Sequence, residues 1–312
     1  MTRAGPEQPD VSVIGRSSEI SQAPSLRSVG AMLLLSLMWG LSIPVTKLGL
    51  QSLPPLTLTA LRFVIAVLLL TIFVLGRQRI LLRALLPIAG LGVLGIGVGQ
   101  VAQTFGVMDT SASVATIISA TIPVFIVVFA ALRLKQSVSG RQKLGLLAAF
   151  TGIVMVALGD VKELDDLLRS SAIGATFVLV SAIAIAFYYV WSVELTNQYG
   201  TATVAAWSTM FGFLALLPWA GWEMSRVQLA LTWEAIAAAV YLGVVVTVAG
   251  LFLWLNILRV VPARIAASVQ LLQPIFGVAV SAAIFGDKIG TLVMAGVILV
   301  LAGVALTTRS GR

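Results

Sequence analysis

The chain has 312 residues, of which 59 % are hydrophobic and only 10 % are charged, whereas an ordinary soluble domain is about 25 % charged. This composition indicates a protein of the lipid bilayer. The chain contains no Cys and no His, which excludes thiolate and imidazole metal sites, disulfides and histidine-based catalysis, so neither a metal nor a cofactor is expected. The net charge of +8 comes from basic residues scattered between apolar runs rather than gathered in one patch, so nucleic acid is not an expected partner.

The first 28 residues combine Pro, Ser and charges of both signs without an apolar stretch. Such a segment cannot bury enough apolar surface to fold alone, and it lacks the apolar core of a secretory signal peptide. We therefore expect residues 1–28 to form a disordered tail.

Apolar stretches of about 20 residues follow the tail, each long enough to cross roughly 30 Å of hydrocarbon as a helix. There are ten of them, over residues 30–50, 56–75, 84–107, 110–132, 141–159, 172–195, 202–221, 233–257, 263–285 and 290–307. One sizeable polar interruption, residues 160–171, separates the fifth stretch from the sixth. The sequence therefore predicts an all-α integral membrane protein with ten transmembrane helices.

Glycines and prolines recur in the two halves at one constant offset. The first-half residues Gly92, Gly99, Pro123, Gly145 and Gly152 correspond to Gly243, Gly250, Pro274, Gly296 and Gly303. Five spans per half is an odd number, so the second half enters the membrane with the opposite orientation. We predict a 5+5 inverted repeat, with residues 30–159 and 172–307 as the two repeats and 160–171 as the loop between them. Such repeats are typical of secondary transporters, which bind solute near the membrane midplane.

The distribution of Lys and Arg predicts the orientation. With the N-terminus in the cytoplasm, 14 of the 20 Lys and Arg residues lie in the tail or in loops on the cytoplasmic side. The positive-inside rule therefore predicts that both termini are cytoplasmic. Short loops and the absence of a transit peptide favour a bacterial cytoplasmic (inner) membrane.

Three charged residues stand out within the predicted spans, where a charge usually faces a cavity or a partner. Lys47 and Arg62 lie in the outer half, where they could attract an anionic solute and where Asp109 is their expected protein partner. Glu194 lies in the inner half and is the only acidic residue clearly inside a predicted span, so we expect it to carry the proton if transport is proton-coupled. Lys47 and Glu194 would then mark opposite mouths of one pathway. Alternatively, both are long side chains that reach the headgroups.

Polar and aromatic residues at helical spacing suggest the lining of a cavity. Gln100 and Gln103 are three residues apart, as are Gln270 and Gln273, and they either bind solute or bond neighbouring helices. An aromatic wall with a few polar groups suits an amphipathic solute of amino-acid size. The expected solute-binding residues are Trp39, Arg62, Gln100, Gln103, Ser119, Tyr188, Trp191, Trp254, Gln270 and Gln273. Tyr188, Tyr189 and Trp191 could equally form an interfacial aromatic belt.

Prolines and glycines inside the spans suggest bends and close contacts. Pro123 and Pro274 are equivalent in the two repeats, so we expect them to bend their helices and to gate the pathway together with Lys47 and Glu194. The Gly95-x-x-x-Gly99 pattern lets another helix approach closely, either within one chain or at the seam of a homodimer.

Several short motifs give the chain a family resemblance. They are Met38-Trp39-Gly40, Leu61-Arg62-Phe63, Pro123, Gln273-Pro274, Phe285-Gly286-Asp287 and Leu301-Ala302-Gly303. Together they resemble EamA-type members of the drug/metabolite transporter superfamily over residues 33–158 and 174–306. The resemblance implies ten-helix exporters of amino acids and other small metabolites with a central cavity. In one departure, Leu134-Lys135-Gln136 stands where many relatives have an acidic residue.

We therefore expect a secondary transporter that exports small organic metabolites, above all amino acids, by alternating access. Its expected partners are a small-molecule solute and the lipid bilayer. One alternative is a carrier for phosphorylated or nucleotide-linked sugars, which would need more cations than Lys47 and Arg62; another is a non-transporting membrane scaffold. The chain has no GxxxxGK[ST] phosphate loop for nucleotide-driven pumping and no nucleophile beside an intramembrane base, so an enzyme is not expected.

Overall fold

The structure is a computed structural model that describes residues 25–74, 81–134, 139–159, 171–227, 229–260, 272–287 and 290–308. All regular elements in these ranges are helices. Of the predicted tail, residues 1–24 lie outside the described residues, and residues 26–28 already form the first turn of a helix, so the boundary predicted at residue 28 is too late. Of the predicted inter-repeat loop, residues 160–170 lie outside the described residues.

The first half contains eight α-helices and one π-helix, η2, among the described residues. They are α1 (Leu26–Gly40), α2 (Ser42–Gly49), α3 (Pro55–Val74), α4 (Leu82–Gly90), η2 (Leu91–Gly97), α5 (Val98–Asp109), α6 (Ala112–Ser119), α7 (Ile122–Leu134) and α8 (Gly140–Gly159). The described second half comprises α10 (Ser171–Trp191), α11 (Val193–Tyr199), α12 (Thr201–Arg226), α13 (Trp233–Val240), the π-helix η3 (Tyr241–Ala249), α14 (Gly250–Val260), α16 (Gln273–Phe285) and α17 (Thr291–Thr308).

Seven stretches of the described chain are long and apolar enough to cross a membrane. They are Leu26–Gly49, Pro55–Ile72, Leu82–Asp109, Ala112–Arg133, Ala172–Trp191, Thr201–Arg226 and Trp233–Trp254, and the apolar helices Gln273–Phe285 and Thr291–Leu306 are shorter. The chain is therefore an all-α multi-pass membrane protein. The count of ten spans and the 5+5 arrangement stay predictions.

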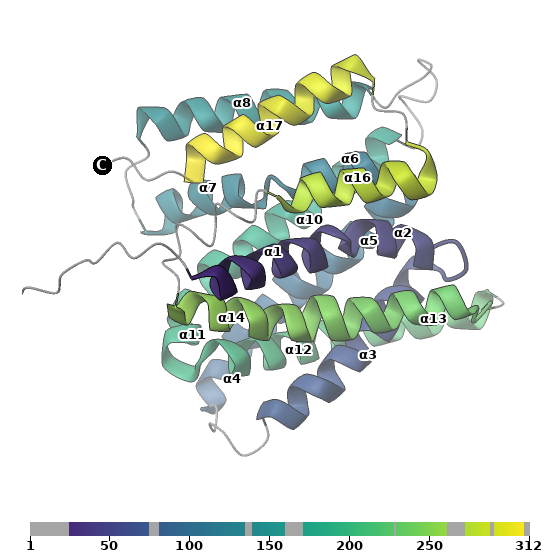
Figure 1. The fold of residues 1–312 in the computed structure, drawn as a ribbon. Coiled ribbons are helices and arrows are strands. Elements are labelled where there is room, and N and C mark those ends of the chain that lie inside the picture. Colours follow the sequence, from purple (N-terminus) through teal and green to yellow (C-terminus); the bar gives the residue numbers. More distant parts are fainter. Residues whose placement is uncertain are drawn as a thin grey trace, which may run out of the picture.

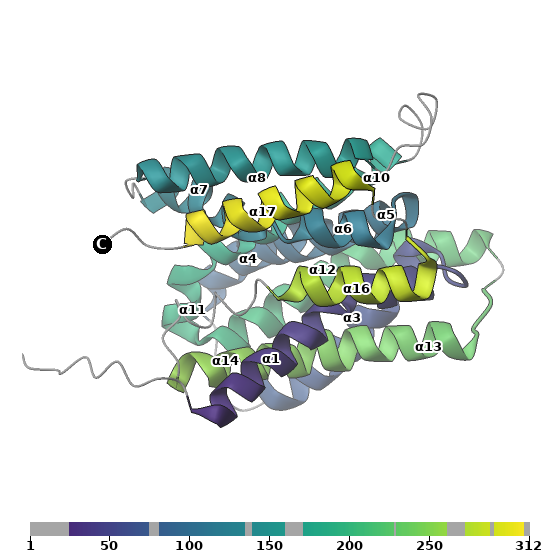
Figure 2. The same cartoon turned by 45° about the horizontal axis from the view of Figure 1, so that its top comes forward.

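The helices lie side by side along one common direction (Figures 1 and 2). The start of α1, the end of α17 and the short helix α11 lie at one end of the bundle, and α2 and the start of α13 lie at the other. Helices α8 and α17 pack along each other at one edge.

The contact between α8 and α17 depends on glycines that are equivalent in the two halves. A Cβ atom on Gly152 would lie 2.7 Å from the backbone oxygen of Gly296 and from the backbone nitrogen of Val300. A Cβ atom on Gly303 would lie 2.5 Å from the backbone nitrogen of Ala149. Only glycine permits backbones to approach this closely, as at other membrane helix pairs.

A second pair of equivalent glycines makes matching contacts. Gly92, on η2, packs on the backbone of Ser208 in α12, and Gly243, on η3, packs on the backbone of Arg62 in α3. Both glycines lie within a π-helix, a rare form with widened turns. Corresponding positions in the two halves therefore share both an unusual backbone form and a close helix contact.

The Gly95-x-x-x-Gly99 face is used within the chain. A Cβ atom on Gly95 would lie 2.5 Å from the Cβ atom of Tyr188, and one on Gly99 would lie 3.1 Å from Ile185. Both contacts are with α10. The pattern therefore serves a close helix contact within one chain, which is one of the two alternatives given for it above.

Each of the two equivalent prolines lies in the first turn of a helical segment. Pro123 is the second residue of α7, which follows a break after Ser119, and Pro274 is the second residue of α16. A proline in the first turn of a helix removes no helical hydrogen bond. Pro123 lies within the span Ala112–Arg133, whose helix breaks between Ser119 and Ile122, as expected for a bend at this proline, and the break suits a hinge. The residues directly before Leu272 lie outside the described residues, so a bend before Pro274 stays a prediction.

We predict that Gly152→Ala destabilises the protein by about 1–3 kcal/mol, because its methyl group forces the backbones of α8 and α17 apart. The measurement is thermal unfolding in detergent. Gly140→Ala, at the start of the same helix, is the matched control, since a Cβ atom there meets nothing within 4 Å. Equal unfolding temperatures for the two variants would contradict the prediction.

Candidate functional site

One arginine lies buried between three helical segments. Arg62, on α3, has 9 % of its surface exposed. Its Nη1 donates to the side-chain oxygen of Gln100 on α5 at 2.6 Å, and its Nε donates to the hydroxyl of Thr247 on η3 at 3.1 Å. Both acceptors are neutral, so they orient the guanidinium without neutralising its charge. The expectation that Asp109 is the protein partner of Arg62 is therefore wrong.

The widened turn of η3 places Thr247 beside Arg62. The hydroxyl of Thr247 donates to the carbonyl of Leu242, five residues earlier, at 2.8 Å, and its oxygen accepts from Arg62. Widened turns of this kind often occur at functional sites. Sequence reasoning missed Thr247, because an apolar run with one threonine carries no sign of a π-helix.

Two further predicted site residues have polar groups available for a solute. Gln103 is half-buried on α5, on the face of Gln100, and has no hydrogen-bond partner among the described residues. The hydroxyl of Ser119, at the last residue of α6, is buried and also lacks a partner in the described part of the chain. Gln273 begins α16, where its carbonyl lies close to Gly40, and Gln270 lies outside the described residues.

Trp39 and Trp254 form an aromatic pair with ring centroids 6.0 Å apart. The indole N–H of Trp39 donates to the carbonyl of Val246 at 3.0 Å, one residue before Thr247. The hydroxyl of Tyr241 donates to the carbonyl of Met38 at 2.9 Å. Because these bonds fix α1 against η3, Trp39 can offer a solute its ring face and not its N–H.

The predicted stripe of Tyr188, Trp191 and Glu194 does not face one cavity. Tyr188 is buried against Gly95. Trp191 instead packs with Phe129, at a centroid distance of 5.5 Å, and belongs to a cluster at the end of the bundle where α7, α10 and α11 meet. The neighbouring Tyr189 is exposed, as a residue of an interfacial belt would be.

The carboxylate of Glu194 pairs with Arg133 at 3.0 Å, and 74 % of the Glu194 side chain is exposed. The Arg133 guanidinium also lies over the ring of Trp191, 5.2 Å from its centroid. Glu194 belongs to the short helix α11, after the apolar stretch that ends at Trp191. The expectation that Glu194 lies inside the sixth span is therefore wrong, because the sequence placed the end of that span too late.

Lys47 stabilises the end of a helix. Its ammonium group donates to the carbonyls of Val107, Met108 and Thr110 at 2.8, 3.0 and 2.8 Å, where α5 ends. A cation at the carbonyl end of a helix satisfies otherwise unpaired acceptors and complements the helix dipole. Helices α2 and α11, which carry Lys47 and Glu194, lie at opposite ends of the bundle (Figure 1).

Two carboxylates that sequence reasoning did not place in a site bind the starts of other helices. Glu223, on α12, is 9 % exposed and accepts from the backbone nitrogen and hydroxyl of Thr57 at 2.7 and 2.8 Å, in the first turn of α3. Asp287 accepts from the backbone nitrogen and hydroxyl of Ser113 at 3.0 and 2.7 Å, in the first turn of α6. Gly286, with φ of 67°, ends α16 in the left-handed conformation that brings Asp287 into position.

We predict that Glu223→Met destabilises the protein by about 1–3 kcal/mol, because the N–H groups of the first turn of α3 lose their buried acceptor. Thermal unfolding of Glu223→Met, Thr57→Val and the double variant measures the effect. The double variant should lose less stability than the sum of the two single losses, since both remove the same bond. Additive losses of stability would show that the bond between the Thr57 hydroxyl and Glu223 contributes nothing to stability.

The profile of the EamA-like transporter family matches residues 26–158 and again residues 172–309. An uncharacterized transporter of Archaeoglobus fulgidus is 25 % identical and covers 87 % of this chain and 95 % of its own. An uncharacterized inner membrane transporter of Escherichia coli K12, YedA, is 24 % identical, and the match covers 89 % of this chain and 90 % of its own. A solved crystal structure with 16 % identity covers 90 % of this chain and 96 % of its own at a TM-score of 0.60, which supports the fold. The chain therefore belongs to the EamA-like transporter family and is a membrane transporter.

Proposed function

We propose that this transporter exports small organic metabolites that carry a carboxylate, above all amino acids, by alternating access of two inverted five-helix repeats. The proposal includes ten transmembrane spans and cytoplasmic termini. It also places the protein in the bacterial cytoplasmic membrane, in line with the name of the Escherichia coli relative. The separate match of the family to each half, over residues 26–158 and 172–309, supports the two repeats.

The buried guanidinium of Arg62 is the observation that carries the solute class. A buried charge is costly unless a partner or solute compensates for it. Arg62 is bonded to neutral Gln100 and Thr247, and a guanidinium has more N–H donors than two bonds use. A planar carboxylate matches the fork of donors that remains.

Other predicted site residues suit the rest of an amino-acid-like solute. The half-buried amide of Gln103 and the buried hydroxyl of Ser119 have no partner among the described residues, so they can bond polar groups of a solute. The paired rings of Trp39 and Trp254 offer apolar surface. An apolar wall with a few convergent polar groups is the usual form of a small-molecule site.

Matching backbone features support the alternating mechanism. Gly92 and Gly243 each lie in a π-helix and each pack against the backbone of a helix from the other half. Two halves with equivalent contacts can exchange their roles, so that the pathway opens to one side and then to the other. Lys47 and the Arg133–Glu194 pair, at opposite ends of the bundle, are the proposed gating elements.

A carrier for phosphorylated or nucleotide-linked sugars is the alternative within transport. Such a solute needs several cations around its phosphates. Of the two cations expected in the spans, Lys47 is bonded to three backbone carbonyls, which leaves Arg62 for the solute. A non-transporting scaffold, in contrast, would give no solute flux in proteoliposomes.

We predict that Arg62→Ala abolishes the preference of the transporter for amino acids over the corresponding amino-acid amides. Losing a charged hydrogen bond to the carboxylate should lower acid transport by about tenfold or more and leave amide transport less affected. The measurement is uptake and efflux of labelled acid and amide pairs in proteoliposomes.

Thr59→Val is the matched control for this experiment, since Thr59 is also buried on α3 but bonds Thr104 rather than Arg62. This variant should keep the preference for the acid. An Arg62→Ala protein that is correctly folded and still prefers the acid would contradict the proposed solute class. Absence of flux for the whole panel with the wild-type protein would favour the scaffold.

We predict that charge exchange at the α7–α11 contact separates two roles of Glu194. If the Arg133–Glu194 pair only holds the end of the bundle closed, Glu194→Arg alone should alter transport, and the combined Arg133→Glu/Glu194→Arg variant should restore it. If Glu194 carries a coupled proton, the combined variant should transport solute without responding to an imposed pH gradient. If efflux driven by an imposed pH gradient survives in Glu194→Gln, the coupling role of Glu194 is excluded and facilitated diffusion is favoured.

A further inference from the structure

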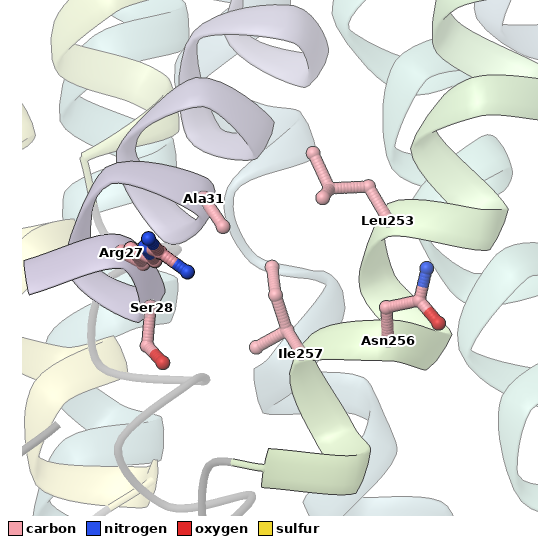
Figure 3. A pocket seen from close by; sticks show the side chains of 6 residues that line it. All are labelled: Arg27, Ser28, Ala31, Leu253, Asn256 and Ile257. Atoms are coloured by element: carbon pink, nitrogen blue, oxygen red, sulfur yellow. The ribbon is translucent and has the colours of Figure 1, made fainter. Parts of the chain in front are cut away.

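A pocket of about 210 Å³ lies between the start of α1 and the end of α14, apart from the Arg62 site. Its lining residues are Arg27, Ser28, Ala31, Leu253, Asn256 and Ile257. Figure 3 shows the three α1 residues on one side of the pocket and the three α14 residues on the other. Helices α1 and α14 both lie on the near face of the bundle in Figure 1.

The contact between α5 and α10, which corresponds to that between α1 and α14, is a close approach of two glycines. The offset that matches Lys47 with Glu194 makes α10 the counterpart of α1, and it places Gly174 at the position of Arg27. The offset of the repeated glycines makes α5 the counterpart of α14, and it places Gly106 at the position of Ile257. A Cβ atom on Gly106 would lie 2.7 Å from the carbonyl oxygen of Gly174, so α5 and α10 touch there through their backbones. The equivalent positions on α1 and α14 carry Arg27 and Ile257, so these two helices lack this glycine contact.

The chemistry of the pocket is that of an interface between water and hydrocarbon. Arg27 and Asn256 are exposed and supply a cation and an amide, and Ser28 supplies a hydroxyl. No carboxylate is among the lining residues, so nothing in the lining neutralises Arg27. Ala31, Leu253 and Ile257, the last of which is 2 % exposed, form the apolar part.

The surface of α1 continues the pocket as an apolar stripe. Arg27, Ala31 and Leu34 are spaced by four and three residues and therefore lie on one face of the helix. Leu34 is 51 % exposed, as expected for a side chain in contact with lipid. A cation at the end of a helix followed by an exposed apolar stripe matches a charged headgroup followed by an acyl chain.

We propose that the α1–α14 pocket binds an acidic phospholipid, with the phosphate at Arg27 and an acyl chain along Ala31 and Leu34. Basic pockets between membrane helices are established sites for acidic headgroups. The occupant is a lipid and not a free anion, because the pocket continues into the exposed apolar stripe. A lipid bound here would fill the space between α1 and α14 that corresponds to the glycine contact between α5 and α10.

The test is native mass spectrometry of delipidated full-length protein with phosphatidylglycerol and with phosphatidylcholine of the same acyl chains. The wild-type protein should retain phosphatidylglycerol in preference. Arg27→Gln should bind it about fivefold more weakly, the effect of removing one interfacial basic residue. Arg27→Lys should retain binding, and Ala31→Phe should reduce it by filling the pocket while leaving the charge.

Arg83→Gln is the matched control, since Arg83 is also exposed in the first turn of a helix, α4, at the same end of the bundle. This variant should bind phosphatidylglycerol like the wild-type protein. Equal retention of the two lipids, an equal loss in Arg83→Gln, or unchanged binding in Arg27→Gln would each overturn the proposal. Displacement of the lipid by inorganic phosphate at millimolar concentration would show a free-anion site instead. Lipid retention is measured without transport, so its outcome is independent of the proposed solute.

Discussion

The backbone of a membrane protein must satisfy its own hydrogen bonds, because hydrocarbon offers no water to helix ends. At three helix ends of this protein, charged side chains from elsewhere in the chain supply those bonds. Lys47 binds the carbonyls at the end of α5, and Glu223 and Asp287 bind the N–H groups at the starts of α3 and α6. Once these three charges are assigned to helix ends, Arg62 stands out as a buried charge that, within the described part of the chain, is bonded only to neutral side chains.

The two halves share backbone contacts but not the side chains of the Arg62 site. Glycines and π-helices occur at corresponding places in both halves. The matching contacts of Gly92 and Gly243 place Ser208 where Arg62 lies, and the positions that correspond to Gln100 and Thr247 carry Leu251 and Ile96. The buried guanidinium of Arg62 therefore has no charged counterpart at the corresponding contact.

The sequence predicted the helical class and the approximate spans because both depend on long apolar runs. It also named both Arg62 and Gln100 as candidate solute-binding residues, since each is a polar residue in an apolar run, but it did not pair them. It did not predict the bond of Thr57 to Glu223, because the partners lie far apart in the chain and no local pattern connects them. The π-helices were missed for a different reason: an apolar segment looks the same whether its turns are narrow or wide. Glu194 was misplaced because span boundaries depend on a few residues at the end of an apolar run.

The bond between Glu223 and the first turn of α3 joins a helix of the first half to α12 of the second half. Pulling α3 away from α12 at this end would leave a buried carboxylate and buried N–H groups unpaired together, which is far more costly than tilting one helix against the other. In the proposed alternating-access motion, this bond would hold α3 and α12 together at one end of the bundle, and the two helices would separate at the opposite end, where Arg133 meets Glu194.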